Sequence, residues 1–212
     1  MIFAIWSKTP HFRIMFEIKD LSNEIPYLIF EEKYKLAIDG GQKNIEAISI
    51  SSYNKELDLV DSRYVNLKFI DGKKFIFFSN YESPKSIAFR SHDQISALIY
   101  WSSINVQIRM RANIHLTSKE FNKNYFKQRS KEKNALAISS QQSSYTESYE
   151  QVKKNYFKTL SSNNLRKCPE YWGGYYFVPY YFEFWEGHKS RLNKRDAYEL
   201  IKENWNHFVL QP

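Results

Sequence analysis

Cysteine is almost absent from this sequence, because Cys168 is the only one. A single cysteine excludes an internal disulfide and is typical of proteins that stay in a reducing compartment. We therefore expect a cytoplasmic protein in which Cys168 is a bystander rather than a nucleophile. Glycine and proline are also scarce, with six residues each among 212, which excludes collagen-like segments and long flexible linkers.

Long apolar runs are missing as well. The opening segment MIFAIW is too short for a signal-peptide core, lacks a basic leader and has no small-residue cleavage site. No stretch approaches the roughly 20 apolar residues of a membrane span, so we expect no membrane partner. The five histidines are scattered without metal-ligand spacing, which predicts no metal site. Neither a Gly-x-Ser-x-Gly motif nor a glycine-rich phosphate loop occurs.

What the chain does have is apolar and aromatic residues, at 42% and 17%, which predict one globular domain over 25–212. Residues 1–24 form the expected N-terminal arm, a candidate for flexibility. The net charge is +8, and from Arg109 to Lys133 eight Lys and Arg residues accompany two acids. Such a patch suits phosphate on a polymer or on a small molecule. Because most aromatic residues fall on expected buried strand positions, we expect no nucleic-acid partner.

A period of two in the apolar residues dominates the chain. It predicts strands at 47–51, 63–70, 73–79, 95–101, 106–116 and 175–185, with an Asp71-Gly72 hairpin turn. Helices are predicted at 25–38, at 84–90 with Ser83 as cap, from a Thr117–Glu120 capping box to about 129, and at 196–203. Residues 134–150 are expected to hold a loop and the start of another helix. Many antiparallel strands with few helices indicate a mainly β barrel or sandwich.

Two groups of residues could bind anions. Tyr125 and Arg129, four apart on a helix, project from one face as a phosphate clamp, although an arginine stem packed on a tyrosine is the alternative. Arg63 and Lys68 have opposite parity on one strand, which suits two different anions, or two solvated charges. The turn from Ser79 to Lys85 adds hydroxyls and a helix N-terminus, although ordinary caps look the same.

The C-terminal quarter is dense in tryptophan and arginine. Trp172-Gly173-Gly174 is followed by Glu183-Phe184-Trp185 and by two arginines, Arg191 and Arg195. Tryptophan beside arginine can flank a planar heteroaromatic ring. An aromatic core edge with surface arginines is the alternative.

Taken in order, these segments resemble the pyridoxine/pyridoxamine 5′-phosphate oxidase family. Order and spacing hold from about Pro26 to Pro212. The matching elements are Arg63-x-Val65-x-Leu67-Lys68, Phe75-x-Phe77-Phe78-Ser79-Asn80-Tyr81-x-Ser83-x-Lys85, Gln107, Tyr125-Phe126-x-x-x-Arg129, Gln142-Ser143, Trp172-Gly173-Gly174, Glu183-Phe184-Trp185-x-Gly187 and Arg191-Leu192-x-x-Arg195.

The resemblance implies an antiparallel FMN-binding split β-barrel and a homodimer with FMN at its interface. It implies an oxidase that converts pyridoxamine or pyridoxine 5′-phosphate, a small phosphorylated pyridine, to pyridoxal 5′-phosphate, with O2 as acceptor and H2O2 as product. By the same resemblance, FMN is contacted by Arg63, Tyr64, Val65, Lys68, Phe78, Ser79, Lys85, Gln107, Gln142, Ser143, Trp185 and Arg195. The substrate phosphate is contacted by Lys68, Tyr125, Arg129 and Lys133, while Arg191 lies over the substrate ring, and Arg191 and Asn193 are the catalytic positions.

Three positions depart from the family pattern. The family has histidine at Asn193, an arginine at Pro84 and a serine at Lys133. Asn193 can donate a hydrogen bond but cannot shuttle a proton, whereas Lys133 replaces a hydroxyl by a cation. Two alternatives therefore stay open: a flavin-dependent oxidase with another, phenazine-type substrate, and a non-catalytic protein that binds flavin or pyridoxal phosphate. The retained Lys68, Tyr125 and Arg129 favour a phosphorylated substrate.

Overall fold

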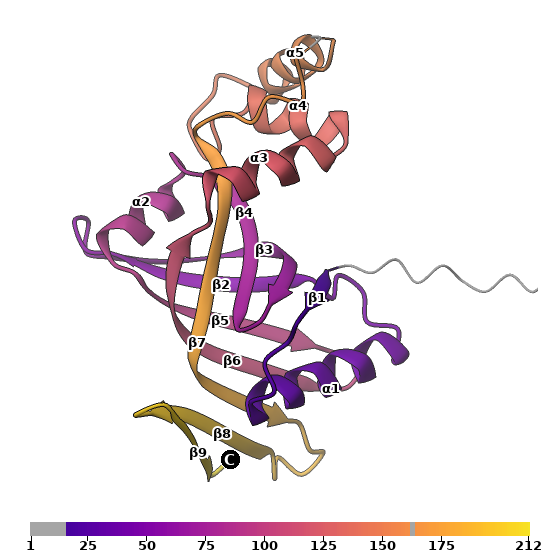
Figure 1. Cartoon of the computed structure of the whole chain (residues 1–212), viewed down its shortest axis with the longest axis vertical. Helices are drawn as coiled ribbons and strands as arrows, with labels where there is room; N and C mark the ends of the chain where they lie inside the picture. The colour runs from indigo at the N-terminus through magenta and orange to yellow at the C-terminus, as the bar shows by residue number, and fades with distance from the viewer. Residues whose placement is uncertain (1–15, 162–163) are drawn as a thin grey trace, which may run out of the picture.

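A closed six-stranded antiparallel barrel forms the centre of the computed structural model, which describes residues 16–161 and 164–212 (Figure 1). Its strands pair in the order β3-β2-β5-β6-β7-β4, and β4 returns to β3. The predicted mainly β, antiparallel architecture is thereby confirmed, and the barrel replaces the sandwich alternative. The strands are β2 (Ala47–Asn54), β3 (Leu59–Asp71), β4 (Lys74–Asn80), β5 (Gln94–Trp101), β6 (Val106–Leu116) and β7 (Trp172–Glu186).

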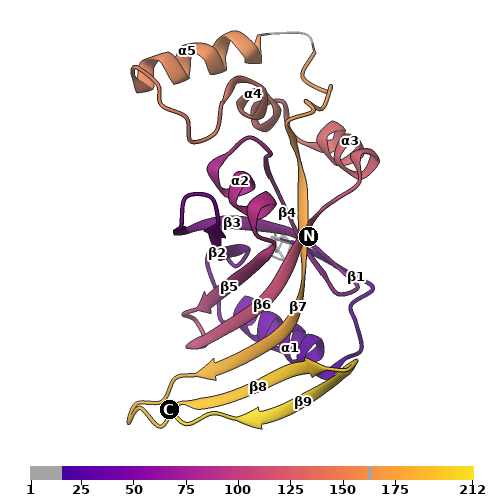
Figure 2. The same cartoon turned by 90° about the vertical axis from the view of Figure 1, so that its left-hand side faces the viewer.

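Three further strands extend the sheet outside the ring. β1 (Glu17–Lys19) pairs parallel with β3, and β8 (Lys194–Ile201) and β9 (Asn204–Val209) continue from the far half of β7. Figures 1 and 2 show β8 and β9 at one end of the long axis. Of the predicted arm 1–24, residues 1–15 lie outside the described residues, and β1 belongs to the rest.

Five helices complete the described chain: α1 (Ile25–Asp39), α2 (Pro84–Ser91), α3 (Lys119–Gln128), α4 (Lys131–Ser139) and α5 (Tyr149–Leu160). α1 turns Tyr27, Phe30 and Ala37 into the barrel core, where the Phe30 ring lies 5.1 Å from Phe75 and 5.5 Å from Trp101. α3, α4 and α5 follow one another between β6 and β7 and lie at the end of the molecule opposite β8 and β9 (Figure 2). In the described ranges no helix is long and apolar enough to span a membrane.

The period-two pattern explains the barrel wall. In β6 the apolar Val106, Ile108, Met110 and Ala112 are buried, and the residues between them face outward. Since successive strand side chains point to opposite faces, this alternation alone specifies which face lines the core. The predicted strands and the hairpin at Gly72, whose φ is +57°, are confirmed.

The helix predicted at 196–203 is wrong, because these residues belong to β8 and to the turn into β9. Tyr198 pairs with Phe182 on one side and His207 on the other, so strand hydrogen bonds are available along both edges. The turn consists of Lys202 and Glu203, both at positive φ, +46° and +71°. Glycine or asparagine normally announces such a turn, and neither is present at these two positions.

Two predicted helix caps also differ. The Thr117–Glu120 capping box is wrong, because Ser118 is the cap of α3 and its hydroxyl accepts from the Phe121 N–H at 3.2 Å. Ser83 does occupy the cap position of α2 but does not cap through its side chain, since its hydroxyl donates to the Asn80 carbonyl at 2.8 Å.

Candidate functional site

Two adjoining cavities lie between β3, β4 and the first two helices of the helical segment, which consists of α3, α4 and α5. The larger measures about 690 Å³ and the smaller about 340 Å³. Five residues line both of them: Asn66, Lys68, Tyr125, Arg129 and Lys133. The predicted substrate-phosphate residues are thus brought together, although they come from β3, α3, the end of α3 and α4.

The smaller cavity gathers many of the predicted cofactor residues as well. It is also lined by Tyr64, Val65, Phe78, Ser79, Lys85 and Gln142. No ion pair joins Lys68, Lys85, Arg129 or Lys133 to any residue that the structure describes. Four cations without carboxylate partners around one space indicate a site for anionic groups such as phosphate.

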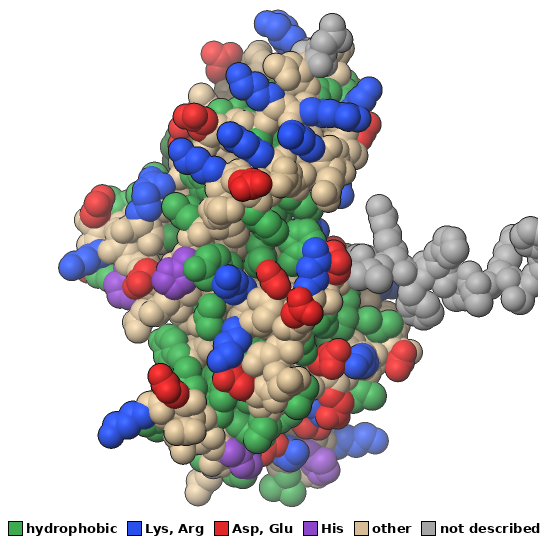
Figure 3. All heavy atoms as spheres, in the orientation of Figure 1, with side chains coloured by type: hydrophobic (Ala, Val, Ile, Leu, Met, Phe, Trp, Pro, Cys, Tyr) green, Lys and Arg blue, Asp and Glu red, His purple; other side chains and the backbone are tan. Residues whose placement is uncertain are grey.

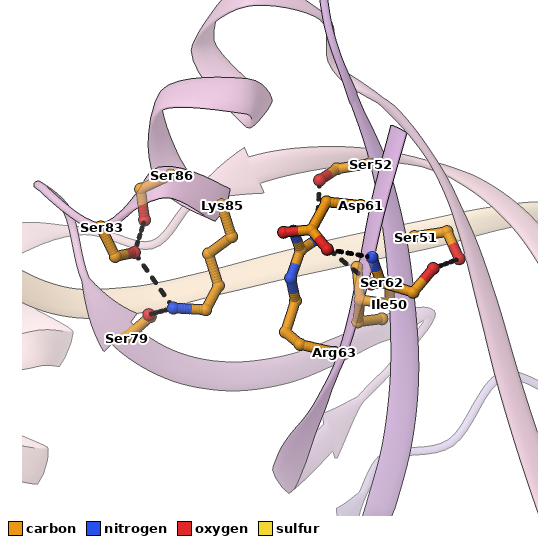
Figure 4. Close-up of polar contacts among 10 residues, drawn as sticks. All are labelled: Ile50, Ser51, Ser52, Asp61, Ser62, Arg63, Ser79, Ser83, Lys85 and Ser86. Atoms are coloured by element: carbon orange, nitrogen blue, oxygen red, sulfur yellow. Dashed lines mark hydrogen bonds and ion pairs between the residues drawn. The ribbon is translucent and has the colours of Figure 1, made fainter. Parts of the chain in front are cut away.

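Lys85 is the most deeply placed of these cations. Its side chain leaves the first turn of α2 and its Nζ donates to the hydroxyls of Ser79 and Ser83, both at 3.0 Å (Figure 4). Ser79 in turn donates to Gln142 Oε1 at 3.1 Å, which ties β4 to the loop after α4. Burial, together with the nearby Arg63 charge, lowers the pKa of Lys85 to about 8. A bound anion would compensate for this cost.

Arg63 lines neither cavity. Its guanidinium donates to Ser52 Oγ at 2.7 Å and to the Ile50 carbonyl at 3.3 Å, and it forms an ion pair with Asp61 at 2.7 Å (Figure 4). Lys68, at the bulge between Leu67 and Phe69, lines both cavities. The two cations of this strand therefore have different surroundings.

Arg129 is held against an aromatic stack. Its guanidinium lies 4.4 Å from the Trp172 ring centroid, and one terminal nitrogen, Nη2, donates to the Lys133 carbonyl at 3.2 Å. The other, Nη1, is buried and has no hydrogen-bond partner among the described residues. The Phe78 ring stacks at 4.1 Å on Tyr125 and at 5.0 Å on Trp172. The stack fixes the position of Arg129 and leaves a guanidinium donor free for a ligand.

Burial shifts the pKa values of this clamp. Burial lowers the pKa of Lys68 and of Arg129 and raises that of Tyr125. For Lys68, the neighbouring Lys133 and Arg129 charges act in the same direction, while Glu46 opposes them. Each shift disfavours the charged form, and a bound phosphate would restore the charge of the two cations.

The remaining predicted residues lie elsewhere. Gln107, Trp185 and Arg195 form a row across β6, β7 and β8, and β8 lies at the end of the molecule opposite α3, α4 and α5 (Figures 1 and 2). Arg191, at a φ of +60°, and Asn193, whose Oδ1 accepts from the His188 N–H at 3.0 Å, precede β8 in an exposed loop. Ser143 follows Gln142 and is exposed.

Glu183 is the centre of a second ionic cluster, which the sequence did not single out as a site. It is 1% exposed, and its carboxylate accepts from Arg195 at 2.8 and 2.9 Å, from Arg109 at 3.0 Å and from Tyr181 at 3.2 Å. The cluster fixes the Arg195 guanidinium. Its signal in the sequence was a lone acid in an aromatic strand opposite an arginine on β6.

Several cavity residues were not foreseen. They are Phe16, Glu17, Glu46, Asn66, Phe69, Gln128 and Ser130 in the larger cavity, and Trp172 in the smaller one. Trp172 belongs to a motif of the family resemblance, but no contact with the cofactor or the substrate was predicted for it. Gly173 and Gly174 follow it because a Cβ on Gly173 would lie 2.1 Å from the Tyr81 hydroxyl, so this strand passes too close for a side chain.

The surface agrees with an anionic ligand on the helical side. Lys and Arg side chains gather over the helical end on the face shown in Figure 3. Among residues 16–161 and 164–212, no group of three or more His, Cys, Asp or Glu side chains is placed to hold a metal ion.

Comparison with solved structures bears on the fold. PhzG from Burkholderia lata 383, in complex with tetrahydrophenazine-1-carboxylic acid, superposes with a TM-score of 0.83 at 22% identity, over 88% of this chain and 92% of that one. A pyridoxamine 5′-phosphate oxidase-related, FMN-binding protein from Nostoc punctiforme gives 0.73 at 11% identity, over 86% and 97%. The fold is therefore the FMN-binding split barrel that was predicted.

Comparison of sequences identifies the family. Residues 172–212 match the pyridoxine 5′-phosphate oxidase C-terminal dimerisation region. Pyridoxine/pyridoxamine 5′-phosphate oxidase from Colwellia psychrerythraea is 32% identical over 90% of this chain and 88% of its own length, and that from Rhodopirellula baltica is 31% identical over 86% and 82%. This chain belongs to the pyridoxine/pyridoxamine 5′-phosphate oxidase family.

Proposed function

We propose that this protein is an FMN-dependent oxidase that converts pyridoxamine or pyridoxine 5′-phosphate to pyridoxal 5′-phosphate. The observation that carries the proposal is the set of four cations, Lys68, Lys85, Arg129 and Lys133, around two adjoining cavities. One phosphate belongs to the cofactor and one to the substrate, so two spaces that share a cationic wall are what the reaction needs. A cytoplasmic location is part of the proposal and rests on the single cysteine.

The residues present fit the cofactor. Lys85, with hydroxyl partners, and Ser79 suit the FMN phosphate. Arg63 is assigned to it as well, although its guanidinium pairs with Asp61 and lines neither cavity. Tyr64, Val65, Phe78, Gln142 and Ser143 are assigned to the flavin from this chain. Bound FMN would supply the redox chemistry, as acceptor of the hydride from the substrate C4′ carbon and donor of two electrons to O2.

The protein contributes orientation and charge at the substrate. The Lys68 ammonium, the Arg129 guanidinium and the Tyr125 hydroxyl are assigned to its phosphate, with Lys133 as a further cation. Binding of the substrate phosphate fixes the position of the pyridine ring, so that the hydride transfer takes place between positioned groups. Arg191 and Asn193 are assigned to the ring and the reacting carbon.

A homodimer is part of the proposal. Gln107, Trp185 and Arg195 are assigned to the flavin, yet they line neither cavity and lie on β6, β7 and β8, of which β8 is at the end of the molecule opposite α3, α4 and α5. A second copy would bring these residues to the cavities of the first. The match of residues 172–212 to a dimerisation region supports this assembly.

The decisive experiment uses the visible spectrum and a peroxide assay. The purified protein is titrated with FMN and then supplied with pyridoxamine and pyridoxine 5′-phosphates. We expect flavin uptake, peroxide release and pyridoxal 5′-phosphate. Failure to bind FMN would refute the cofactor assignment, whereas bound flavin without turnover would point to the non-catalytic alternative.

One second candidate has a specific observation in its favour. The superposition with PhzG, together with Lys133 and Asn193 at the substrate end, favours an oxidase of a phenazine-type substrate. The ligand of that PhzG structure, a tetrahydrophenazine carboxylic acid, carries a carboxylate and no phosphate. Turnover of that acid but not of the pyridine phosphates would establish this candidate.

A further inference from the structure

The larger cavity contains an acidic side chain that the proposed function does not use. Glu46 stands just before β2 and lines this cavity with Lys68, Arg129 and Lys133. Its Oε2 is buried and accepts no hydrogen bond from any residue in the described ranges. A buried carboxylate oxygen without a donor is costly, which indicates that a ligand supplies the donor.

The other acid of the cavity is already paired. Glu17 forms an ion pair with Lys19 at 3.5 Å, whereas Glu46 forms none with the described part of the chain. Glu46 is nevertheless near enough to Lys68 to raise its pKa against the effect of burial. The cavity therefore presents an anionic group next to the cations of the phosphate clamp.

The two substrates of the proposed function differ at one group. Pyridoxamine 5′-phosphate carries an aminomethyl group, an ammonium at neutral pH, where pyridoxine 5′-phosphate carries a hydroxymethyl group. This group and the phosphate-bearing arm sit on neighbouring ring carbons. A substrate whose phosphate is bound by Lys68 therefore keeps its 4′ substituent in the vicinity of the carboxylate next to that lysine.

We propose that Glu46 is a specificity-determining residue that accepts a hydrogen bond from the substrate ammonium and makes pyridoxamine 5′-phosphate the preferred substrate. This inference rests on the proposed function. A carboxylate also accepts a hydrogen bond from an alcohol, but only the ammonium adds a full opposite charge. The preference therefore arises from charge rather than from shape.

A different role for Glu46 predicts a different result. If Glu46 acted only by keeping Lys68 protonated, its loss would weaken the grip on the phosphate, which both substrates carry. The two substrates would then lose affinity by the same factor. The ratio between them separates the two roles.

The test compares wild type, Glu46→Gln and Glu46→Asp, with Glu56→Gln, an exposed acid in the β2–β3 turn, as the matched control. kcat/KM is measured for each substrate from peroxide release. Affinities are measured by calorimetry on the flavin-loaded protein, reduced in advance so that no turnover interferes. We expect Glu46→Gln to lower affinity and kcat/KM for the amine about tenfold and to change those for the alcohol less than about twofold. Glu46→Asp and Glu56→Gln should keep the preference for the amine.

If Glu46→Gln lowers the affinity and kcat/KM equally for both substrates, or for neither, the inference is overturned while the proposed function stands. If wild type binds FMN but neither substrate is bound or oxidised, the proposed function fails and the inference fails with it. Circular dichroism and retained FMN uptake show whether Glu46→Gln is folded. If Glu46→Gln does not fold, Glu46→Asp provides the test. Loss of the preference for the amine in Glu46→Asp, which keeps the negative charge, would refute the charge argument.

Discussion

Lys85→Met should stabilise the flavin-free protein and at the same time weaken its binding of phosphate. Lys85 is 7% exposed, and its charged nitrogen is held by two serine hydroxyls rather than by a carboxylate. Methionine has a similar length and no charge, so it fits the same space without desolvating a cation. The substitution therefore separates the free-energy cost of burying the Lys85 charge from the contribution of that charge to phosphate binding.

The magnitude follows from the pKa. A drop in the pKa of Lys85 from 10.5 in the unfolded chain to about 8 in the folded chain corresponds to a free-energy cost of about 3 kcal/mol for burying the cation. The two hydrogen bonds to hydroxyls that the variant loses are worth about 1 kcal/mol each. We expect the free energy of unfolding of flavin-free Lys85→Met to exceed that of wild type by about 1 kcal/mol at pH 7.

The pH dependence gives a second check. Since the folded pKa lies below the unfolded one, the unfolded chain binds more protons between about pH 8 and 10.5. Wild-type stability should therefore rise across this window, and the advantage of Lys85→Met should disappear there. Below pH 8 the difference should be constant.

The assay is urea denaturation of the flavin-free proteins from pH 7 to 10.5, with FMN affinity measured by quenching of flavin fluorescence. FMN should bind Lys85→Met about 10- to 100-fold more weakly at pH 7, because a charge-assisted hydrogen bond is lost. A variant that is no more stable than wild type would refute the desolvation argument. Unchanged FMN affinity would refute the assignment of Lys85 to the phosphate.

Three further predictions concern the clamp, the ionic cluster and the core. Arg129→Ala should raise the Michaelis constant for pyridoxamine 5′-phosphate at least tenfold while the exposed Lys127→Ala does not, and equal constants would contradict the clamp. Glu183→Gln leaves two partly exposed guanidinium groups without their carboxylate, so urea denaturation should show a loss of about 2 kcal/mol. Phe75→Ala, at a fully buried position, should cost about 4 kcal/mol, against less than about 0.5 for the exposed Phe157→Ala.

The strands were predictable because their signal is local. In β6 every second residue is apolar, and a strand whose side chains alternate between core and surface needs no distant information. The hairpin at Gly72 was likewise predictable from the sequence, because glycine adopts a positive φ at little cost. Closure of the ring by β4 was not predictable from periodicity, since it pairs residues about 100 positions apart, such as Phe77 with Tyr175.

β8 shows why local reasoning failed. The segment from Asp196 contains Ala, Leu, Glu and Lys, all good helix formers, and intrinsic preference favours a helix. Pairing with β7 and β9 overrides that preference, because both edges of the segment gain strand hydrogen bonds. The turn that would have revealed the hairpin, Lys202-Glu203, has no glycine or asparagine.

The site was predictable where a motif joined residues that are near in sequence, and not elsewhere. Tyr125 and Arg129 share one helix, and their meeting follows from its period. Glu46 has no sequence signal, because it precedes β2 in a loop, where its backbone carbonyl accepts from the Leu67 N–H of β3 and its side chain lines the larger cavity. Its position depends on tertiary structure alone.

The separation of the predicted flavin residues into two sets makes the dimer testable without a structure of it. One set, with Lys85, lines the smaller cavity, and the other, with Arg195, forms the row across β6, β7 and β8. If each flavin site takes one set from each copy, Lys85→Met and Arg195→Ala each damage both sites of their own homodimers. A heterodimer of the two variants has one intact site and one doubly damaged site.

Random pairing makes about half of the dimers heterodimers, each with one intact site of two, so about a quarter of the wild-type sites should return. The measurement is FMN bound at high affinity by the two variants produced together, against each variant alone. Recovery near a quarter requires that the sets act across the two copies, because complementation within one chain is impossible when each chain lacks one of them. No recovery, with mixed dimers shown by mass, would refute the assembly in which each flavin site takes one set of residues from each copy.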